Sequence, residues 1–268
     1  MEAGVAALHI ETGRRAAWNG KRPFPMASVY KVPIALEVLL QVEAGTFSLA
    51  DSLTIQPRDF VGGPNPSVAD ARGRAATLTV RRLLGFMLTD SDNTASDALL
   101  WAVGGPGVVR ERMRALGIEG IDVSRYEAEV FAEAAAGRGP SADDPRDAAT
   151  AEALVRLLEV IHGGAVLSPD SRALLLSDLT ATTVGAGRIR GLLPPETTVA
   201  HKTGTHTPVT NDVGIVELPD GTHVALAILV MGRETGSLVE RELVIAKIAR
   251  AIYDAFSTGG DAPSVSGA

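Results

Sequence analysis

Phe24-Pro25-Met26-Ala27-Ser28-Val29-Tyr30-Lys31 leads into a mostly apolar run, and the pattern predicts a helix over Val29–Ala44. Ser28 and Lys31 are three residues apart, so on a helix they share one face with an axial separation of about 4.5 Å. A buried amine in that position can accept the proton of a serine hydroxyl and make the serine a nucleophile. An isolated pair of this kind is more often a capping serine followed by a solvated lysine. The pair therefore needs support from elsewhere in the chain.

Two further strings supply the remaining groups that acyl transfer to a serine needs. Ser91-Asp92-Asn93 brings a second hydroxyl and a carboxamide to the joint between helices expected over Leu78–Leu88 and Thr94–Val103. Lys202-Thr203-Gly204 brings a second cation to the end of a strand expected over Val199–Lys202. Each string alone is typical of a structural feature, a helix N-cap or a strand end. Their order, and their placement on a helix start, an interhelical joint and a strand, favour a catalytic site.

The composition limits the class of protein. The 268 residues are 46% apolar and 21% charged, which is enough apolar material for a sizeable core. A formal net charge of −7 argues against nucleic acid or an anionic membrane surface as the main partner. The absence of cysteine excludes disulfides, thiolate catalysis and cysteine-bound metal. The apolar runs are too short or too interrupted by charge to cross a bilayer, and no signal-peptide pattern opens the chain.

Strand patterns lie at both ends of the chain and helix patterns lie between them. We expect a mixed α/β fold, an α+β sandwich, in which the two ends build one antiparallel sheet. A single domain over 1–256 would have a sheet lobe at about 1–27 and 182–256, a helical lobe at about 28–181, and the site in the cleft between. A disordered tail is expected over 257–268. The other expected strands are Val5–Ile10, Arg15–Trp18, Val213–Glu217 and His223–Met231, and the other expected helices are Pro106–Leu116, Asp147–His162, Ser168–Leu179 and Leu238–Phe256.

The three strings and their flanks resemble the class A serine β-lactamases, and the resemblance covers most of the chain. The similar segments are Phe24–Ser28, Leu88–Leu99, His201–Thr205 and Asn211-Asp212. The resemblance implies hydrolysis of the β-lactam amide bond in a small-molecule substrate, without a cofactor, by a monomer. It also implies a periplasmic or secreted location, since export is the rule in this family.

The resemblance implies a role for each residue of the three strings. Ser28 would attack the lactam carbonyl, Lys31 would accept its proton, and Ser91 would relay a proton to the leaving nitrogen. Asp92 would brace the loop. Substrate binding would fall to the others: Asn93 would hold the substrate amide, Lys202 and Thr203 would grip its carboxylate, Gly204 would let it lie against the strand, and the Thr205 N–H would complete the oxyanion hole.

A further region is similar to the family's Ω loop, which activates the deacylating water. It reads Arg125-Tyr126-Glu127-Ala128-Glu129-Val130-Phe131 and ends at Arg146-Asp147, and we expect much of 126–145 to be a long surface loop. The resemblance makes Glu127 the general base and predicts an ion pair between Arg125 and Asp147. The chain departs from the family pattern at Ala128, which replaces a proline, and at Phe131, which replaces a water-holding asparagine. Since phenylalanine cannot hydrogen-bond a water, slower deacylation is expected, whereas acylation should be unaffected.

Arg188 is the expected second anchor for the substrate carboxylate, because in part of the family an arginine at this position supplies that guanidinium. Arg190 is expected to be a surface or structural residue. The five histidines lack metal-ligand spacing, so no metal is predicted, and His201 and His206 are expected to line the cleft beside the third string. The remaining large aromatic residues, Trp18, Trp101 and Tyr126, are assigned to packing.

Three functions remain open from the sequence. A β-lactamase is favoured by Glu127 with its flanking Arg125 and Asp147. A DD-peptidase or penicillin-binding serine esterase, with slow deacylation of β-lactams, shares all three strings and is favoured by Phe131. A non-catalytic binding or sensor module would keep the fold, but the intact Ser28 argues against it.

Overall fold

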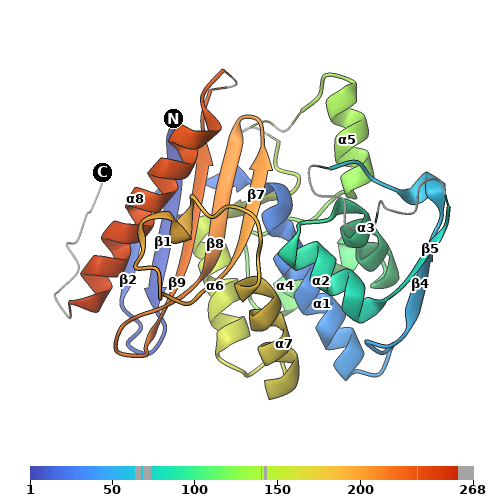
Figure 1. Cartoon of the computed structure of the whole chain (residues 1–268), viewed down its shortest axis with the longest axis horizontal. Helices are drawn as coiled ribbons and strands as arrows, with labels where there is room; N and C mark the ends of the chain where they lie inside the picture. Colours follow the sequence, from blue (N-terminus) through green and yellow to red (C-terminus); the bar gives the residue numbers. More distant parts are fainter. Residues whose placement is uncertain (64–67, 69–73, 140, 142–143, 234, 259–268) are drawn as a thin grey trace.

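An antiparallel sheet of five strands, in the order β2-β1-β9-β8-β7, is built from both ends of the chain (Figure 1). The computed structural model describes residues 1–268 except 64–67, 69–73, 140, 142–143, 234 and 259–268. The first two strands form a hairpin, and the last three form a meander that returns to β1 through β9. Their bounds are Glu2–His9 for β1, Arg15–Trp18 for β2, Val199–His206 for β7, Val209–Glu217 for β8 and His223–Met231 for β9. The predicted fold class is confirmed.

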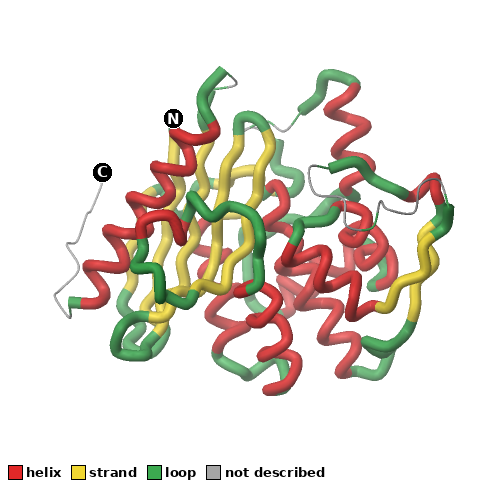
Figure 2. Tube along the Cα trace, viewed as in Figure 1, coloured by secondary structure: helices red, strands yellow, loops and turns green. Residues whose placement is uncertain are grey.

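The sheet is covered on both faces, which explains why β9 is apolar throughout. Side chains alternate along a strand, so Val224, Leu226, Ile228 and Val230 join a core under α8 (Leu238–Ser257). The intervening Ala225, Ala227 and Leu229 join the larger core on the opposite face. There α6 (Ala151–His162) contacts β1 and β9. Figure 2 shows the resulting layers, with helices on either side of the strands.

The remaining helices pack around a central buried helix, α1 (Lys31–Glu43). Its residues from Lys31 to Leu39 are all buried, so it has no solvent-exposed face over more than two turns. The surrounding helices are α2 (Val80–Thr89), α3 (Asn93–Ala102), α4 (Pro106–Ala115) and α7 (Pro169–Thr180). The cleft between this helical part and the sheet holds the site.

Short strands that the sequence analysis missed shorten two expected helices. β3 (Pro23–Pro25) pairs with β6 (Ala148–Thr150), and β4 (Ser52–Ile55) pairs with β5 (Ala76–Thr79). The helices predicted to begin at Leu78 and Asp147 therefore begin later. Each of these helices instead starts after a threonine whose side chain caps it, Thr79 for α2 and Thr150 for α6.

The largest correction concerns 126–145, where part of the expected loop is the helix α5 (Glu127–Ala135). The segment lacks an apolar stripe but is rich in alanine and glutamate, which are strong helix formers. Glu127 and Glu129 place negative charge in the first turn, and Glu129 accepts the Tyr126 N–H at 2.9 Å. The helix ends before Gly137, whose φ is +76°.

The C-terminal boundary also differs from the expectation. Ser257 is the last residue of α8 and not the first residue of a tail. The rest of the predicted tail, from 259 to 268, lies outside the described residues.

Candidate active site

Ser28 lies in a short 3-10 turn, η1 (Ala27–Tyr30), and α1 begins directly after it at Lys31, two residues later than the predicted start at Val29. In a 3-10 turn, side chains three residues apart eclipse, so Ser28 and Lys31 still face the same way. Ala27, which precedes the serine, has a φ of +47°, a backbone conformation that residues other than glycine rarely adopt. The strained residue turns the chain sharply from β3 into α1 and presents Ser28 to the cleft.

Residues of β7 and β8 hold this turn in place. Asn211 on β8 donates from Nδ2 to the carbonyl oxygens of Pro25 and Met26, at 2.8 and 3.0 Å. A Cβ on Gly204 would lie 2.4 Å from the Met26 carbonyl oxygen. The glycine is therefore needed for the approach of β7 to the serine turn, and the role expected for it in letting substrate lie against the strand stays a prediction.

Lys31 lies at the centre of the polar groups and is fully buried. Its Nζ donates to Asn93 Oδ1 at 2.6 Å and to the Ser91 carbonyl oxygen at 2.8 Å. Ser91 Oγ lies at 3.5 Å and Glu127 Oε1 at 3.3 Å. Burial lowers the pKa of Lys31, and the charge of Glu127 opposes that shift. A lysine in this setting is suited to accept a proton.

Ser91 links the two lysines of the site. It adopts a φ of +59° between α2 and α3, and its Oγ accepts a hydrogen bond from Lys202 Nζ at 2.8 Å. Lys202 is fully buried, and its pKa lies well below the usual value because of burial and the nearby charge of Lys31. The hydroxyl of Ser91 thus lies within reach of both amines, as a proton relay requires.

The other two residues of the second string fix the rim of the cleft. Asp92 caps α3 by accepting the Ala95 N–H at 2.7 Å, and its other oxygen accepts the Val68 N–H at 2.9 Å. Asn93 donates from Nδ2 to the Gly62 carbonyl oxygen at 2.9 Å. Asp92 therefore braces the loop, as predicted.

Glu127 is the first residue of α5 and faces Lys31 with only a tenth of its side chain exposed. The sequence analysis missed the residue that holds it there, Asp97 on α3. The two carboxylate oxygens of Asp97 accept the N–H groups of Glu127 and Ala128, at 2.7 and 2.9 Å. Asp97 follows Asn93 by four residues, so the helical spacing alone places both on one face of α3.

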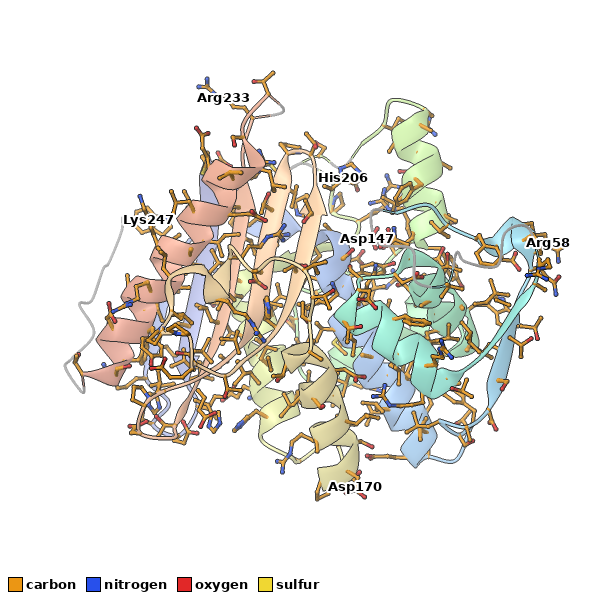
Figure 3. All side chains as sticks on the ribbon, viewed as in Figure 1. Arg58, Asp147, Asp170, His206, Arg233 and Lys247 are labelled. Carbon is orange, nitrogen blue, oxygen red and sulfur yellow. The ribbon has the colours of Figure 1, made fainter. Side chains whose placement is uncertain are left out.

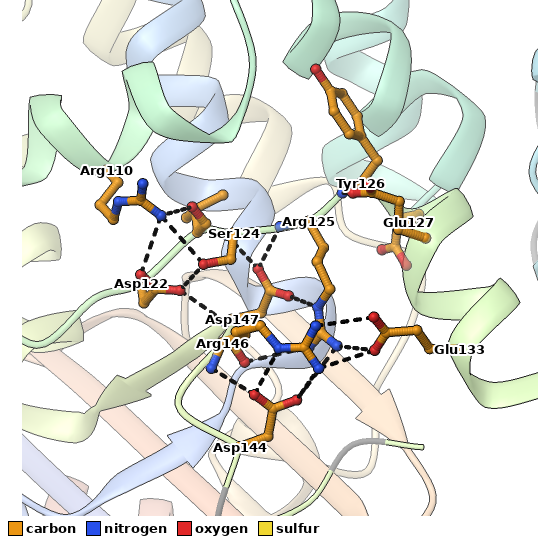
Figure 4. A network of polar contacts seen from close by, with 12 residues as sticks. Arg110, Asp122, Ser124, Arg125, Tyr126, Glu127, Glu133, Asp144, Arg146 and Asp147 are labelled. Carbon is orange, nitrogen blue, oxygen red and sulfur yellow. Dashed lines mark hydrogen bonds and ion pairs between the residues drawn. The ribbon is translucent and has the colours of Figure 1, made fainter. Parts of the chain in front are cut away.

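The predicted ion pair between Arg125 and Asp147 is present, with Nε 2.6 Å from Oδ2 (Figure 4). Arg125 also contacts Glu133 at 2.7 Å, and Arg146 bridges Glu133 and Asp144 at 3.0 and 2.8 Å. Burial raises the pKa of Asp147, although its hydrogen bonds with Ser124 and Arg125 oppose this shift. The network closes the 125–147 segment at its base. It ties α5 to Asp147, whose carbonyl oxygen accepts the Met26 N–H two residues before Ser28, at 2.8 Å.

A cavity of about 320 Å³ is lined by seven of the predicted site residues, whereas Lys31, Lys202 and Gly204 do not line it. Its polar side is formed by Ser28, Ser91, Asn93, Glu127, Arg188, Thr203 and Thr205. Apolar side chains from α5, the start of β8 and the start of α8 form much of the rest, namely Val130, Phe131, Val209 and Leu238. Figure 3 shows His206 at the end of β7 and Asp147 below it, and both residues line the cavity.

Arg188 is buried and belongs to the site rather than to a solvated loop. Its guanidinium donates to the carbonyl oxygens of Gly204 and Asn211 at 3.2 and 2.9 Å, and to Thr205 Oγ1 at 2.6 Å. Nε pairs with Glu242 of α8 at 3.1 Å. The nitrogen that contacts Thr205 is NH2, and both Arg188 and Thr205 line the cavity. Arg190 instead donates to two backbone carbonyl oxygens and is structural, as expected.

His201 does not line the cleft, in contrast to the prediction. By strand alternation His201 shares a face of β7 with Thr203 and Thr205, but it lies nearer the start of the strand and is not among the residues that line the cavity. It is buried and pairs with Asp212, which Nδ1 approaches at 2.8 Å. Asp212 also accepts the Ile189 N–H at 3.0 Å, so this pair holds the η4 turn (Ile189–Leu192) that follows Arg188.

The aromatic residues assigned to packing differ from one another. Trp18 and Trp101 are 52% and 73% exposed, so the packing interpretation is wrong for both. Tyr126 is partly buried against the main core. Within the described part of the chain, no group of three or more acidic or histidine side chains is arranged to hold a metal ion, and no helix has the length and apolarity of a membrane span.

Comparison with known proteins agrees with this geometry. The family model described as the beta-lactamase enzyme family matches residues 1–256. The extended-spectrum beta-lactamase PER-1 of Pseudomonas aeruginosa is 32% identical over 245 residues, which span 88% of this chain and 76% of PER-1. Beta-lactamase VEB-1 of the same organism is 29% identical, over 94% of this chain and 84% of VEB-1.

Solved structures show the same similarity. A beta-lactamase from Chitinophaga pinensis superposes with a TM-score of 0.87 at 34% identity, covering 95% of this chain and 94% of that one. The TLA-1 extended-spectrum beta-lactamase gives a TM-score of 0.87 at 30% identity, over 96% and 93% of the two chains. The chain therefore belongs to the beta-lactamase enzyme family, and its similarity is to the class A serine enzymes.

Proposed function

We propose that this protein hydrolyses the amide bond of β-lactams through an acyl-enzyme on Ser28, which is released by a water that Glu127 activates. Membership of the family supports the reaction. The observation that carries the mechanism is the position of Lys31, whose Nζ lies within 3.5 Å of both Ser91 Oγ and Glu127 Oε1. One amine is thus shared by the group that would complete acylation and the group that would begin deacylation.

In acylation, Ser28 Oγ attacks the lactam carbonyl and its proton passes to neutral Lys31. The C–N bond then breaks, and Ser91 gives its proton to the leaving nitrogen. Ser91 recovers a proton from the ammonium of Lys31, which returns Lys31 to its neutral form. The N–H groups of Ser28 and Thr205 would stabilise the negative charge on the carbonyl oxygen of the tetrahedral intermediate.

In deacylation, Glu127 takes a proton from a water that attacks the ester carbonyl, and Ser28 leaves with that proton. The carboxylate is suited to this step because Asp97 fixes the backbone on which it stands. Phe131 lines the same cavity and offers the water no hydrogen bond. We therefore expect deacylation to be the slower of the two steps.

The substrate carboxylate would bind between Lys202, Thr203 and the terminal nitrogen of Arg188. Burial and neighbouring cations disfavour the charged form of Lys202, so an arriving anion would offset this penalty and stabilise the ammonium. Asn93 would bind the substrate amide from the opposite side of the cavity. A monomeric state and a periplasmic or secreted location remain predictions from the family.

The test combines nitrocefin turnover with intact-protein mass. Wild type should complete many turnovers. Ser28→Ala should neither turn over nitrocefin nor form an adduct, and Glu127→Ala should stop after one equivalent with a stable acyl adduct. Glu129→Ala is the matched control, because this exposed glutamate lies on the same helix and should leave turnover unchanged. A single stoichiometric burst from wild type would instead indicate a penicillin-binding esterase, the function that Phe131 favours. No adduct with any variant would contradict the acyl-enzyme.

A further inference from the structure

A second cavity, of about 640 Å³, lies beside the active site between β4, η2 (Pro57–Asp59), α3 and the start of α5. We call it the α3–α5 groove and define it by Asp59, Phe60, Asp97, Trp101, Tyr126 and Glu129. It shares no lining residue with the cavity around Ser28. Neither the catalytic steps nor substrate binding use it.

Three aromatic side chains give the groove its apolar walls. Phe60 and Tyr126 pack against the main core on one side, so their positions are fixed. Trp101 is 73% exposed, although tryptophan is among the side chains that gain most from burial. An exposed indole and two partly buried rings around one hollow favour a ligand with an apolar group, and the faces of such rings attract cations.

The charges of the groove are mostly negative. Asp59, Asp97 and Glu129 line it, and Arg58 is its one basic lining residue among those described. Arg58 Nε lies 3.6 Å from Asp59 Oδ1, but this pair is weak because both side chains are more than half exposed, and Arg58 lies at the outer edge of the molecule (Figure 3). No ion pair among the described residues involves Asp97, whose oxygens accept only backbone N–H groups. Burial raises the pKa of Asp97 to about 6, so a bound cation would stabilise its carboxylate.

We propose that the α3–α5 groove binds a small organic cation that carries an aromatic or compact alkyl group. Asp97 and Asp59 face its ammonium, and Phe60, Trp101 and Tyr126 surround its apolar part. This combination of rings and carboxylates is the chemistry that recognises substituted ammonium ions. The occupant is distinct from a β-lactam, whose carboxylate the acidic lining would repel.

The groove and the active site meet at the first turn of α5. Figure 4 shows the side chains of Tyr126 and Glu127 pointing in opposite directions. Tyr126 and Ala128 line the groove, whereas Glu127 lines the cavity around Ser28. Asp97 contacts both sides, because it lines the groove and holds the backbone of Glu127. An occupant of the groove would therefore lie one peptide unit from the proposed base.

The chain allows a direct binding test because it has only two tryptophans. In Trp18→Phe, a substitution at a half-exposed residue, Trp101 becomes the sole tryptophan and reports on the groove. We expect 2-phenylethylammonium to change its fluorescence in a saturable way, and the neutral isostere 2-phenylethanol to bind at least 10-fold more weakly. Salt should weaken the binding of the cation. The same titration of the Ser28→Ala variant should give the same affinity, so the result does not depend on turnover.

Two substitutions locate the binding. In the Trp18→Phe background, Asp59→Asn and Phe60→Ala should each weaken the cation at least 3-fold. Asp254→Asn, which removes an exposed carboxylate on α8, is the matched control and should leave the affinity unchanged. The proposal is overturned by a response that does not saturate, by equal affinity for the neutral alcohol, or by equal effects of Asp59→Asn and Asp254→Asn.

Discussion

The carboxylate of Asp97 accepts the backbone N–H groups of Glu127 and Ala128, at 2.7 and 2.9 Å. The first N–H groups of a helix need acceptors from outside the helix. In α5 the side chain of the preceding residue, Tyr126, does not accept them, so a side chain of α3 takes that place. The negative charge also interacts favourably with the N-terminal end of the helix dipole. Asp97 is thus a positioning residue for Glu127, because it fixes the backbone on which the proposed base stands.

The first prediction tests this relationship. Asp97→Ala removes both acceptors, so we expect deacylation to slow by about 10-fold to 100-fold while acylation changes by less than about 3-fold. Asp97→Asn keeps one acceptor oxygen and should lie between Asp97→Ala and wild type. Stopped-flow nitrocefin kinetics with quenched-flow mass spectrometry separate the two rates. Equal losses in both steps would show that Asp97 acts on the whole site rather than on Glu127.

The second prediction concerns pH and follows from the contact between Glu127 and Lys31. Burial lowers the pKa of Lys31, and the negative charge of Glu127 raises it again. Glu127→Gln removes the raising effect, so the pKa of Lys31 should fall and more of the amine should be neutral at a given pH. The acid limb of the acylation rate should therefore move to lower pH, measured as single-turnover acylation between about pH 4 and about pH 9.

Glu129→Gln provides the control for that experiment. Glu129 lies on α5 but is exposed, and it lines the α3–α5 groove and not the cavity around Ser28. Its acid limb should coincide with that of wild type. A limb that stays in place in Glu127→Gln, or moves to higher pH, would contradict the assignment of Lys31 as the proton acceptor of Ser28.

The third prediction concerns stability at the base of the 125–147 segment. Arg125→Ala leaves the largely buried Asp147 without its cation, and breaking such a pair destabilises a protein by about 3 kcal/mol. Urea denaturation should show this loss as a lower midpoint. Arg250→Ala breaks an exposed pair with Asp254 and should leave the midpoint within error. Similar midpoints for the two variants would show that the Arg125 network does not contribute to folding.

The proximity of the candidate catalytic residues was predictable where it depends on residue type and short spacing. Ser28 and Lys31 face the same way whether the backbone forms an α-helix or the observed 3-10 turn. The ion pair of Arg125 with Asp147 was found because two flanking matches marked both of its ends. Both pairs could therefore be recognised from the sequence before their distances were known.

The errors arose where tertiary contacts decide local structure. α5 has no apolar stripe, so hydrophobic periodicity could not reveal it, and the Asp97 carboxylate that supports its first turn lies 30 residues away. His201 was expected in the cleft because it adjoins Lys202 in the sequence. The sequence did not show that His201 pairs instead with Asp212 of the neighbouring strand β8, a buried contact outside the cavity.

The fourth prediction tests the role of Arg188 in holding the substrate carboxylate. Arg188→Gln keeps hydrogen-bond donors for the backbone but removes the positive charge from the cavity. We expect kcat/KM for benzylpenicillin to fall by about 10-fold to 100-fold, mainly through KM. The methyl ester of benzylpenicillin lacks the carboxylate, so its kcat/KM should change by less than about 3-fold. Equal losses for acid and ester would contradict a role in carboxylate binding.

The last prediction concerns Phe131, which follows Glu127 by four residues and therefore lies one turn along the same face of α5. Its ring is 42% exposed and lines the cavity, where it cannot hydrogen-bond the deacylating water. Phe131→Asn adds a donor and an acceptor beside Glu127, so deacylation should become about 3-fold to 10-fold faster while acylation stays the same. Phe131→Leu replaces the ring by a smaller side chain without a polar group, and it should not accelerate deacylation. If both variants were equally fast, the ring would slow the reaction by its size, not by its failure to hold water.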